Sequence, residues 1–266
     1  MTANLLSMRL ITRLSFSEIL ADTNDLIREH KQFWAQFFFV YYVPLAIIQS
    51  YVTADAQEIV QLAVQGDFEE VLAISEEFQD FQIVSWLLGL VTMYFFCVNA
   101  WAVFRQWGGE PYSWSEILRV SLRKWPWVLA TGLLLVILLI VPFIAFVIPG
   151  IFLLVCWSMS LYLVVFLDLT FLDAIKASYN MVIQNWWTVF LLFLVAILIT
   201  AFMGIILSTL LFWAPNMVSF ILSTAVGAYF SVFYVVMFLH VYNYTYPPQN
   251  EEDEFILKTD DLASHS

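Results

Sequence analysis

The chain has 266 residues, of which 62% are hydrophobic and 12% are charged, and its formal net charge is -12. Ordinary soluble domains have roughly half apolar and about a quarter charged residues, so this composition excludes that class and indicates a protein of the lipid bilayer. The acidic balance, with only 10 dispersed Lys and Arg, also argues against nucleic-acid binding.

Long uncharged stretches predict six membrane spans. A charge is costly at the bilayer centre, and about 20 apolar residues cross the hydrocarbon core. With turn signals at Pro149-Gly150 and Pro215-Asn216, the expected spans are about 33–53, 81–104, 127–148, 151–169, 186–211 and 217–244. The predicted fold class is therefore all-α, a polytopic bundle of six transmembrane helices, in which Pro44 and Pro142 kink the first and third spans.

Two acidic segments lie outside the spans. Segment 53–80 carries eight acidic residues and no base, and its apolar residues predict two short amphipathic helices broken at Gly66. The ligand spacing of a calcium loop is missing, so we interpret this outer loop as a solvated lobe, with a partner-docking surface as the alternative. Residues 1–246 form one six-span domain, and the acidic tail 247–266 has the composition of a disordered segment.

All Lys and Arg fall on one side of the predicted spans. They are Arg9, Arg13, Arg28, Lys31, Arg105, Arg119, Arg123, Lys124, Lys176 and Lys258. Because basic residues near span ends are retained in the cytoplasm, both termini are predicted to be cytoplasmic. Residues 1–14 lack the apolar core of a signal peptide, so we expect span one to serve as an uncleaved targeting signal.

A short pattern recurs before spans one, three and five. Its copies are Ser15-Phe-Ser-Glu-Ile-Leu20, Ser113-Trp-Ser-Glu-Ile-Leu118 and Thr170-Phe-Leu-Asp-Ala-Ile175, followed at one offset by Thr23, Ser121 and Ser178. A Ser or Thr three residues before Glu or Asp is typical of a capped helix start. With their apolar stripes, the copies predict three interfacial amphipathic helices, each introducing a hairpin of two spans. The three hairpins are parallel repeats, unlike the inverted repeats of many transporters.

Four polar residues lie within or near the ends of the spans: Asp168, His240, Asn99 and Asn243. Asp168 and His240 share a cytoplasmic depth and could form a proton relay or a polar gate. The favoured interpretation is that Asp168 leads the chain into the Thr170 helix while His240 meets headgroups or water. Asn99 and Asn243 are expected to make interhelical hydrogen bonds.

Small residues and cysteines are expected to serve packing. Ridges recur every four positions in spans five (Ala196, Thr200, Gly204, Ser208) and six (Ser219, Ser223, Gly227, Ser231). Such ridges let helix backbones approach closely, so these spans should pack together or one should face another subunit; a ligand or channel lining is the less favoured alternative. Cys97 and Cys156 lie at depths too different for a disulfide and are interpreted as packing residues.

No catalytic motif is present. The sequence contains no nucleophile elbow, Walker A loop, HExxH helix or Cys/His zinc spacing. We therefore predict no catalytic, metal-binding or cofactor-binding residue, and we do not expect an enzyme.

One pattern suggests a family. It comprises Val147-Ile-Pro-Gly-Ile-Phe-Leu153, Asp168, Asp173-Ala-Ile-Lys-Ala-Ser178 and Trp186-Trp187. The chain resembles, over most of its length, the YciC-like family of uncharacterised bacterial inner-membrane proteins and, more distantly, the membrane domain of some glycerophosphodiester phosphodiesterases. It departs from the pattern at Lys176 and Asn185. The resemblance implies the fold and a bacterial inner-membrane location, and it transfers no catalytic residue.

These observations predict a non-enzymatic inner-membrane protein that acts in envelope or lipid organisation or as an assembly partner. The expected partners are membrane lipids and a membrane protein or second copy of the chain. The alternative is a transporter or channel for a small solute or lipid.

Overall fold

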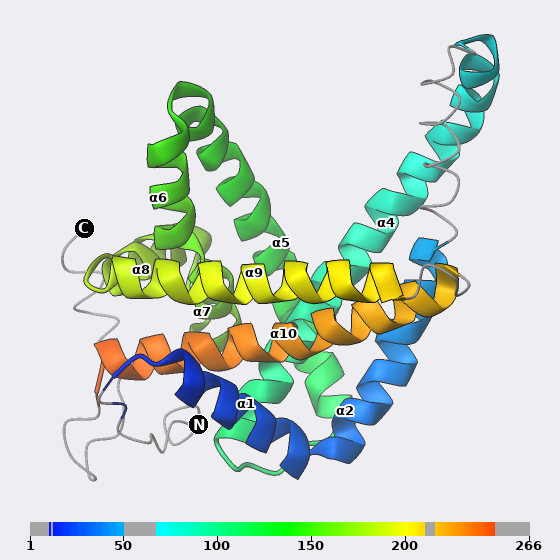
Figure 1. Ribbon diagram of the computed structural model, residues 1–266. Coiled ribbons are helices and arrows are strands. Elements are labelled where there is room, and N and C mark those ends of the chain that lie inside the picture. Colours follow the sequence, from blue (N-terminus) through cyan, green and yellow to red (C-terminus); the bar gives the residue numbers. More distant parts are fainter. Residues whose placement is uncertain (1–10, 12, 51–67, 211–215, 248–266) are drawn as a thin grey trace. The chain divides into compact units, whose positions relative to one another are not determined.

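The structure, a computed structural model, describes residues 11, 13–50, 68–210 and 216–247. Every regular element in this part of the chain is a helix (Figure 1). Six helical segments are long and apolar enough to cross a membrane: Lys31–Ser50, Ile83–Trp107, Trp114–Ala145, Val147–Leu167, Trp186–Leu210 and Met217–Thr245. The predicted all-α class and the number of apolar spans are therefore confirmed. The predicted break at Gly66, the Pro215 turn residue and the tail from 248 lie outside the described residues.

The helices divide between two compact units. In chain order they are α1 (Phe16–Glu29), α2 (Lys31–Phe37), the π-helical turn η2 (Phe38–Tyr42), α4 (Phe68–Trp107), α5 (Trp114–Ala145), α6 (Val147–Trp157), α7 (Ser160–Leu167), α8 (Phe171–Ile183), α9 (Trp186–Leu210) and α10 (Asn216–Thr245). Unit 1 comprises 1–30, 93–197 and 231–266, and unit 2 comprises 31–92 and 198–230. Residues 68–80 of the predicted acidic loop are continuous with span two in α4.

Aromatic rings form the centre of unit 1. Phe104 of α4 stacks on Phe166 of α7, with centroids 4.7 Å apart, and Phe166 contacts Phe238 of α10 at 5.2 Å. Tyr162 and Tyr242 extend this group, at 5.3 Å and 5.8 Å from Phe238. Such pairs stabilise by about 0.5–1.5 kcal/mol each beyond area burial, so they join three helices that are distant in the sequence.

The turn between spans three and four differs from the prediction. The chain reverses at Phe146, whose backbone is extended, and α6 then runs back against α5 (Figure 1). Pro149 and Gly150 lie in the first turn of α6, not in the connection. Pro is tolerated there because the first N–H groups of a helix have no intrahelical acceptor.

The first part of span three also differs from the prediction. The segment expected to be a separate interfacial helix before Trp125 is continuous with the span in α5, which runs through Pro126. By contrast, the helix predicted before span five, α8, is separate from that span, because two residues lie between α8 and α9. A proline in a helix interior costs one hydrogen bond without necessarily ending the helix, so Pro126 alone did not define a boundary.

Two of the three predicted caps are present. Ser113 accepts a hydrogen bond from the Glu116 N–H at 3.2 Å, and Thr170 accepts one from the Asp173 N–H at 3.5 Å. Ser15 occupies the N-cap position of α1 without such a bond. In unit 2, η2 ends at Tyr42, two residues before Pro44. The missing proline N–H removes a regular helical bond, so a local distortion was expected here.

The α5–α6 turn depends on the small size of Gly150. A Cβ atom at this position would lie 2.7 Å from the Phe143 ring. We predict that Gly150→Ala destabilises the protein by about 1–3 kcal/mol, because the ring must move away. Thermal unfolding in detergent measures this effect, with Gly204→Ala as the control, since a Cβ at Gly204 meets no atom within 4 Å. Equal stability losses for the two variants would contradict the prediction.

Candidate functional site

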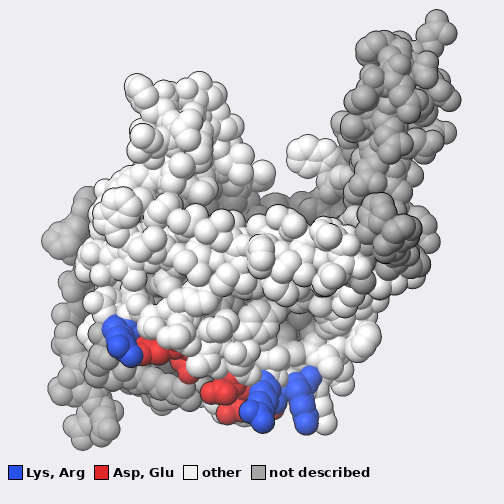
Figure 2. Space-filling model, viewed as in Figure 1, with Lys and Arg blue, Asp and Glu red and all other residues white. Residues whose placement is uncertain are grey.

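Polar contacts in unit 1 surround four residues: Asp168, His240, His30 and Arg105. They connect α1, α4, α5, α7 and α10. Figure 2 shows the charged side chains gathered over α1, whereas the visible surfaces of α9 and α10 carry none. We take these contacts as the candidate functional site.

Asp168 forms an ion pair with Lys124. Its backbone is left-handed, with φ 54° and ψ 26°, and this residue ends α7 before Thr170 caps α8. The Asp168 Oδ1 atom lies 2.6 Å from Lys124 Nζ, and the same ammonium lies 5.3 Å from the centre of the Trp101 ring. The Lys124 side chain is 9% exposed and the Asp168 side chain 74%. The carboxylate therefore compensates a buried cation and holds the end of α7 at α5.

His240 of α10 pairs with Asp22 of α1. Its Nε2 atom lies 2.9 Å from Asp22 Oδ2, and its ring contacts Trp107 edge-on at 5.7 Å. Because a carboxylate only accepts, Nε2 carries the proton. His240 is 2% exposed, so the expectation that it meets headgroups or water is wrong. The structure gives Asp168 and His240 different partners, Lys124 and Asp22, and no contact between the two residues corresponds to the less favoured relay.

Asp22 was not predicted from the sequence as a site residue. The position of Asp22 in the sequence indicates that its side chain faces the core: it lies three residues after Ile19 and four before Leu26, which are both buried on α1. Residues at these spacings share one helix face, so an acid there is directed towards the core and needs a partner.

A second histidine ends α1. The hydroxyl of Tyr112 lies 3.1 Å from His30 Nδ1, and Gln106 Nε2 donates to the same hydroxyl at 3.1 Å. The Tyr112 proton is therefore available to His30, which favours a neutral imidazole. Burial lowers the pKa of His30, and the negative charge of Glu29 opposes this effect. These bonds tie the end of α1 to the connection between α4 and α5.

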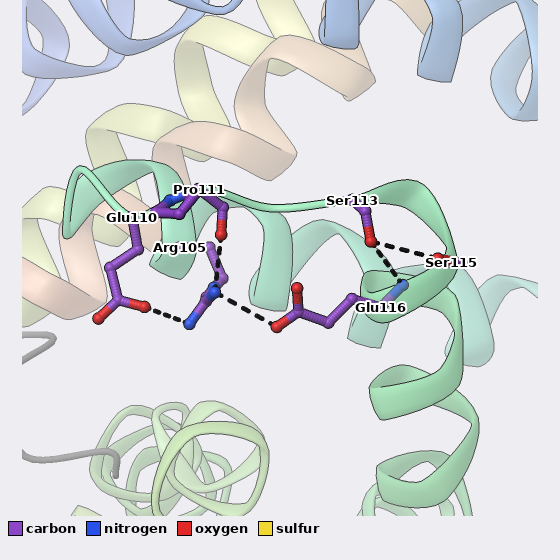
Figure 3. A network of polar contacts seen from close by, with 6 residues as sticks. All are labelled: Arg105, Glu110, Pro111, Ser113, Ser115 and Glu116. Atoms are coloured by element: carbon purple, nitrogen blue, oxygen red, sulfur yellow. Dashed lines mark hydrogen bonds and ion pairs between the residues drawn. The ribbon is translucent and has the colours of Figure 1, made fainter.

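Arg105 fixes that connection (Figure 3). Its guanidinium forms ion pairs with Glu110 and Glu116 and donates to the carbonyl of Pro111 at 2.7 Å. Ser113, in the same network, caps α5 through the Glu116 N–H. A planar cation with five donors can satisfy several acceptors at once, so one residue holds the loop on the end of α4.

The two asparagines are buried, with Asn99 3% and Asn243 1% exposed. Among the described residues, Asn99 Oδ1 and both amide atoms of Asn243 have no hydrogen-bond partner. The prediction of an interhelical hydrogen bond is therefore wrong for Asn243 and for the oxygen of Asn99.

Span four is broken between α6 and α7, a feature that was not predicted from the sequence. The break at Ser158 and Met159 lies near the middle of Val147–Leu167. Ser178 of α8 donates to the Cys156 carbonyl at 2.7 Å and accepts from the Met159 N–H at 3.2 Å. One hydroxyl thus satisfies two backbone groups at the break.

The other two hydroxyls of the repeat are also buried, but they differ in bonding. Thr23 donates to the carbonyl of Ile19 in its own helix at 2.7 Å, and Ser121 Oγ has no hydrogen-bond partner among the described residues. The recurring position is therefore a buried one, and Ser178 is the copy that bonds to the backbone of a neighbouring span.

The packing predictions have mixed outcomes. Cys97 and Cys156 are both fully buried free thiols. Ala196 is buried as well, but a Cβ at Gly204 or Gly227 would meet no atom within 4 Å. The close backbone approach expected at these two glycines is therefore not present in this structure, and contact of either ridge with another subunit stays a prediction.

No protein-family model, curated protein or solved structure matches the chain. The YciC-like resemblance therefore stays a prediction.

The Ser178 bonds are expected to contribute to stability. We predict that Ser178→Ala lowers the free energy of unfolding by about 1–3 kcal/mol, because it leaves a buried donor and acceptor without their partner. Denaturation in detergent measures the loss. Ser208→Ala is the matched control, since Ser208 is exposed and bonds only within its own helix. A Ser178 variant as stable as this control would refute the role of the bonds.

The lowered pKa of His30 predicts that stability depends on pH. Its folded-state pKa is lowered, so the unfolded chain binds more protons and the contribution present above about pH 6.5 is lost as pH falls through the folded-state value. We predict that His30→Gln removes this component of the acid-side loss. Unfolding of both proteins between pH 5 and 8 gives the comparison, and parallel curves would contradict the assignment.

Proposed function

We propose that this chain is a multi-pass protein of the bacterial inner membrane that organises lipid around it and has no enzymatic role. In this proposal both termini are cytoplasmic, and the spans form three parallel hairpins introduced by interfacial helical segments. The one-sided distribution of Lys and Arg in the sequence supports the orientation.

The exposed surface of α8 carries the proposal. One face of α8 is buried through residues that include Ala174, Ser178 and Met181. Its outer surface presents Leu172, Tyr179 and Ile183, which are 53%, 37% and 37% exposed, together with the exposed Lys176. In water this apolar stripe is unfavourable, but at a membrane interface it contacts acyl chains while the Lys176 ammonium reaches the headgroups.

The beginning of α5 has a similar surface. Leu118 and Leu122 are 37% and 59% exposed, and the exposed bases Arg119 and Arg123 lie beside them. Two segments that directly precede or begin spans thus combine apolar and basic side chains on their outer surfaces. Such segments order nearby lipids and can also bind the membrane-facing part of another protein, so an assembly role belongs to the same proposal.

A transporter or channel is the second candidate, favoured by the break in span four. Transporter substrate sites commonly lie at discontinuous helices near the bilayer midplane. Here, however, Ser178 occupies the freed Cys156 carbonyl and Met159 N–H, so these two groups are engaged within the protein. This bonding favours a structural break over a coordination site.

Reconstituted vesicles separate the two functions. We predict that the protein changes headgroup-region lipid order, measured by a polarity-sensitive membrane dye, and that Leu122→Gln with Tyr179→Gln reduces this change. The reason is that both apolar side chains leave the interface. Leu191→Gln, which alters an exposed residue on α9 instead, is the control and should retain more of the effect. Saturable solute flux that is lost on Asp168→Asn would overturn the proposal in favour of transport.

A further inference from the structure

Four exposed bases of unit 1 have no ion-pair partner in the described part of the chain: Arg28, Arg119, Arg123 and Lys176. Other bases are paired, as in Arg13 with Glu18 and Lys124 with Asp168. The chain has 22 acidic and 10 basic residues, so carboxylates are not scarce. Bases left unpaired in an acidic protein are available to an external anion.

Arg119 and Lys176 occupy the same place in the repeat. Each lies six residues after its cap, Ser113 or Thr170, and three residues before an exposed apolar side chain, Leu122 or Tyr179. Residues three apart are neighbours on a helix surface. Each position therefore presents a cation beside an apolar group, which matches the phosphate and adjoining glycerol and acyl region of a phospholipid.

Arg119 and Arg123 also repel each other. They lie four residues apart on α5, and like charges at this spacing destabilise a helix. The adjacent Lys124 is a third cation, and its charge is compensated by Asp168. A phosphate between the two guanidinium groups converts the repulsion into charge-assisted hydrogen bonds, for which guanidinium geometry is suited.

We infer that Arg119 and Arg123 of α5 and Lys176 of α8 bind headgroups of anionic phospholipids. The two elements pack against each other in unit 1. The net charge of -12 opposes attraction of the whole chain to an anionic surface, so local bases must supply it. This inference rests on the proposed interfacial location of the two segments and adds the lipid class that they select.

Tryptophan fluorescence tests the inference on the full chain. The protein is reconstituted in phosphatidylcholine vesicles containing brominated phosphatidylglycerol, and quenching reports lipid next to the ring of an exposed tryptophan such as Trp127, 57% exposed. Brominated phosphatidylglycerol should quench the fluorescence of the wild-type protein more strongly than brominated phosphatidylcholine does. Arg119→Gln, Arg123→Gln and Lys176→Gln should each weaken headgroup binding about fivefold, and the triple variant should abolish the preference.

Matched variants isolate the charge at these positions. Arg13→Gln removes a base whose side chain is 77% exposed but paired with Glu18, and it should leave the preference unchanged. Lys176→Arg and Arg119→Lys keep the charge and should retain binding. Soluble glycerol phosphate at equal phosphate concentration should not displace the lipid, because it lacks the acyl chains that contact Leu122 and Tyr179.

The outcomes separate this inference from the proposed function. If the single variants match Arg13→Gln, or if glycerol phosphate displaces the lipid, the inferred lipid site is wrong. The interfacial location would survive that result if brominated phosphatidylcholine still quenches. If the triple variant fails to fold, salt titration of the wild-type protein decides, since a preference unchanged from 50 to 500 mM salt contradicts charge-based binding.

Discussion

The structure depends on the rule that backbone groups released inside a bilayer must find partners in the protein, because no water is available there. At the break in span four, Ser178 meets this need by bonding to Cys156 and Met159. The bonds fix which face of α8 is buried. The opposite face, with Leu172 and Tyr179, is therefore exposed, and the proposed lipid contact follows from that orientation.

The same constraint explains the polar contacts of unit 1. Lys124 and Arg105 are largely buried cations, and each has an acidic partner; the buried His240 ring likewise bonds to Asp22. A buried cation or polar group without a partner would be costly in a medium of low polarity. These contacts join α1, α4, α5, α7 and α10 to one another. The inferred lipid binding involves exposed bases that take no part in them.

Features encoded by local composition were predictable from the sequence. The last two spans were expected at 186–211 and 217–244, and the corresponding helical segments are Trp186–Leu210 and Met217–Thr245. The caps at Ser113 and Thr170 follow from neighbouring residues as well. The position of Asp22 on the buried face of α1 could be read from the sequence, but its pairing with His240, 218 positions away, could not. The break at Met159 depends on Ser178 of another helix. Such contacts are set by tertiary packing, which periodicity does not encode.

Cysteine accessibility tests the central claim of one-sided interfacial segments most directly. Single cysteines replace the exposed residues Ser115, Gln184 and Phe146, and the native Cys97 and Cys156 give little background because both are buried. In intact spheroplasts, a membrane-impermeant thiol reagent should label position 146 alone, while positions 115 and 184 react only after the membrane is opened. Labelling of 115 or 184 in intact spheroplasts would contradict the account.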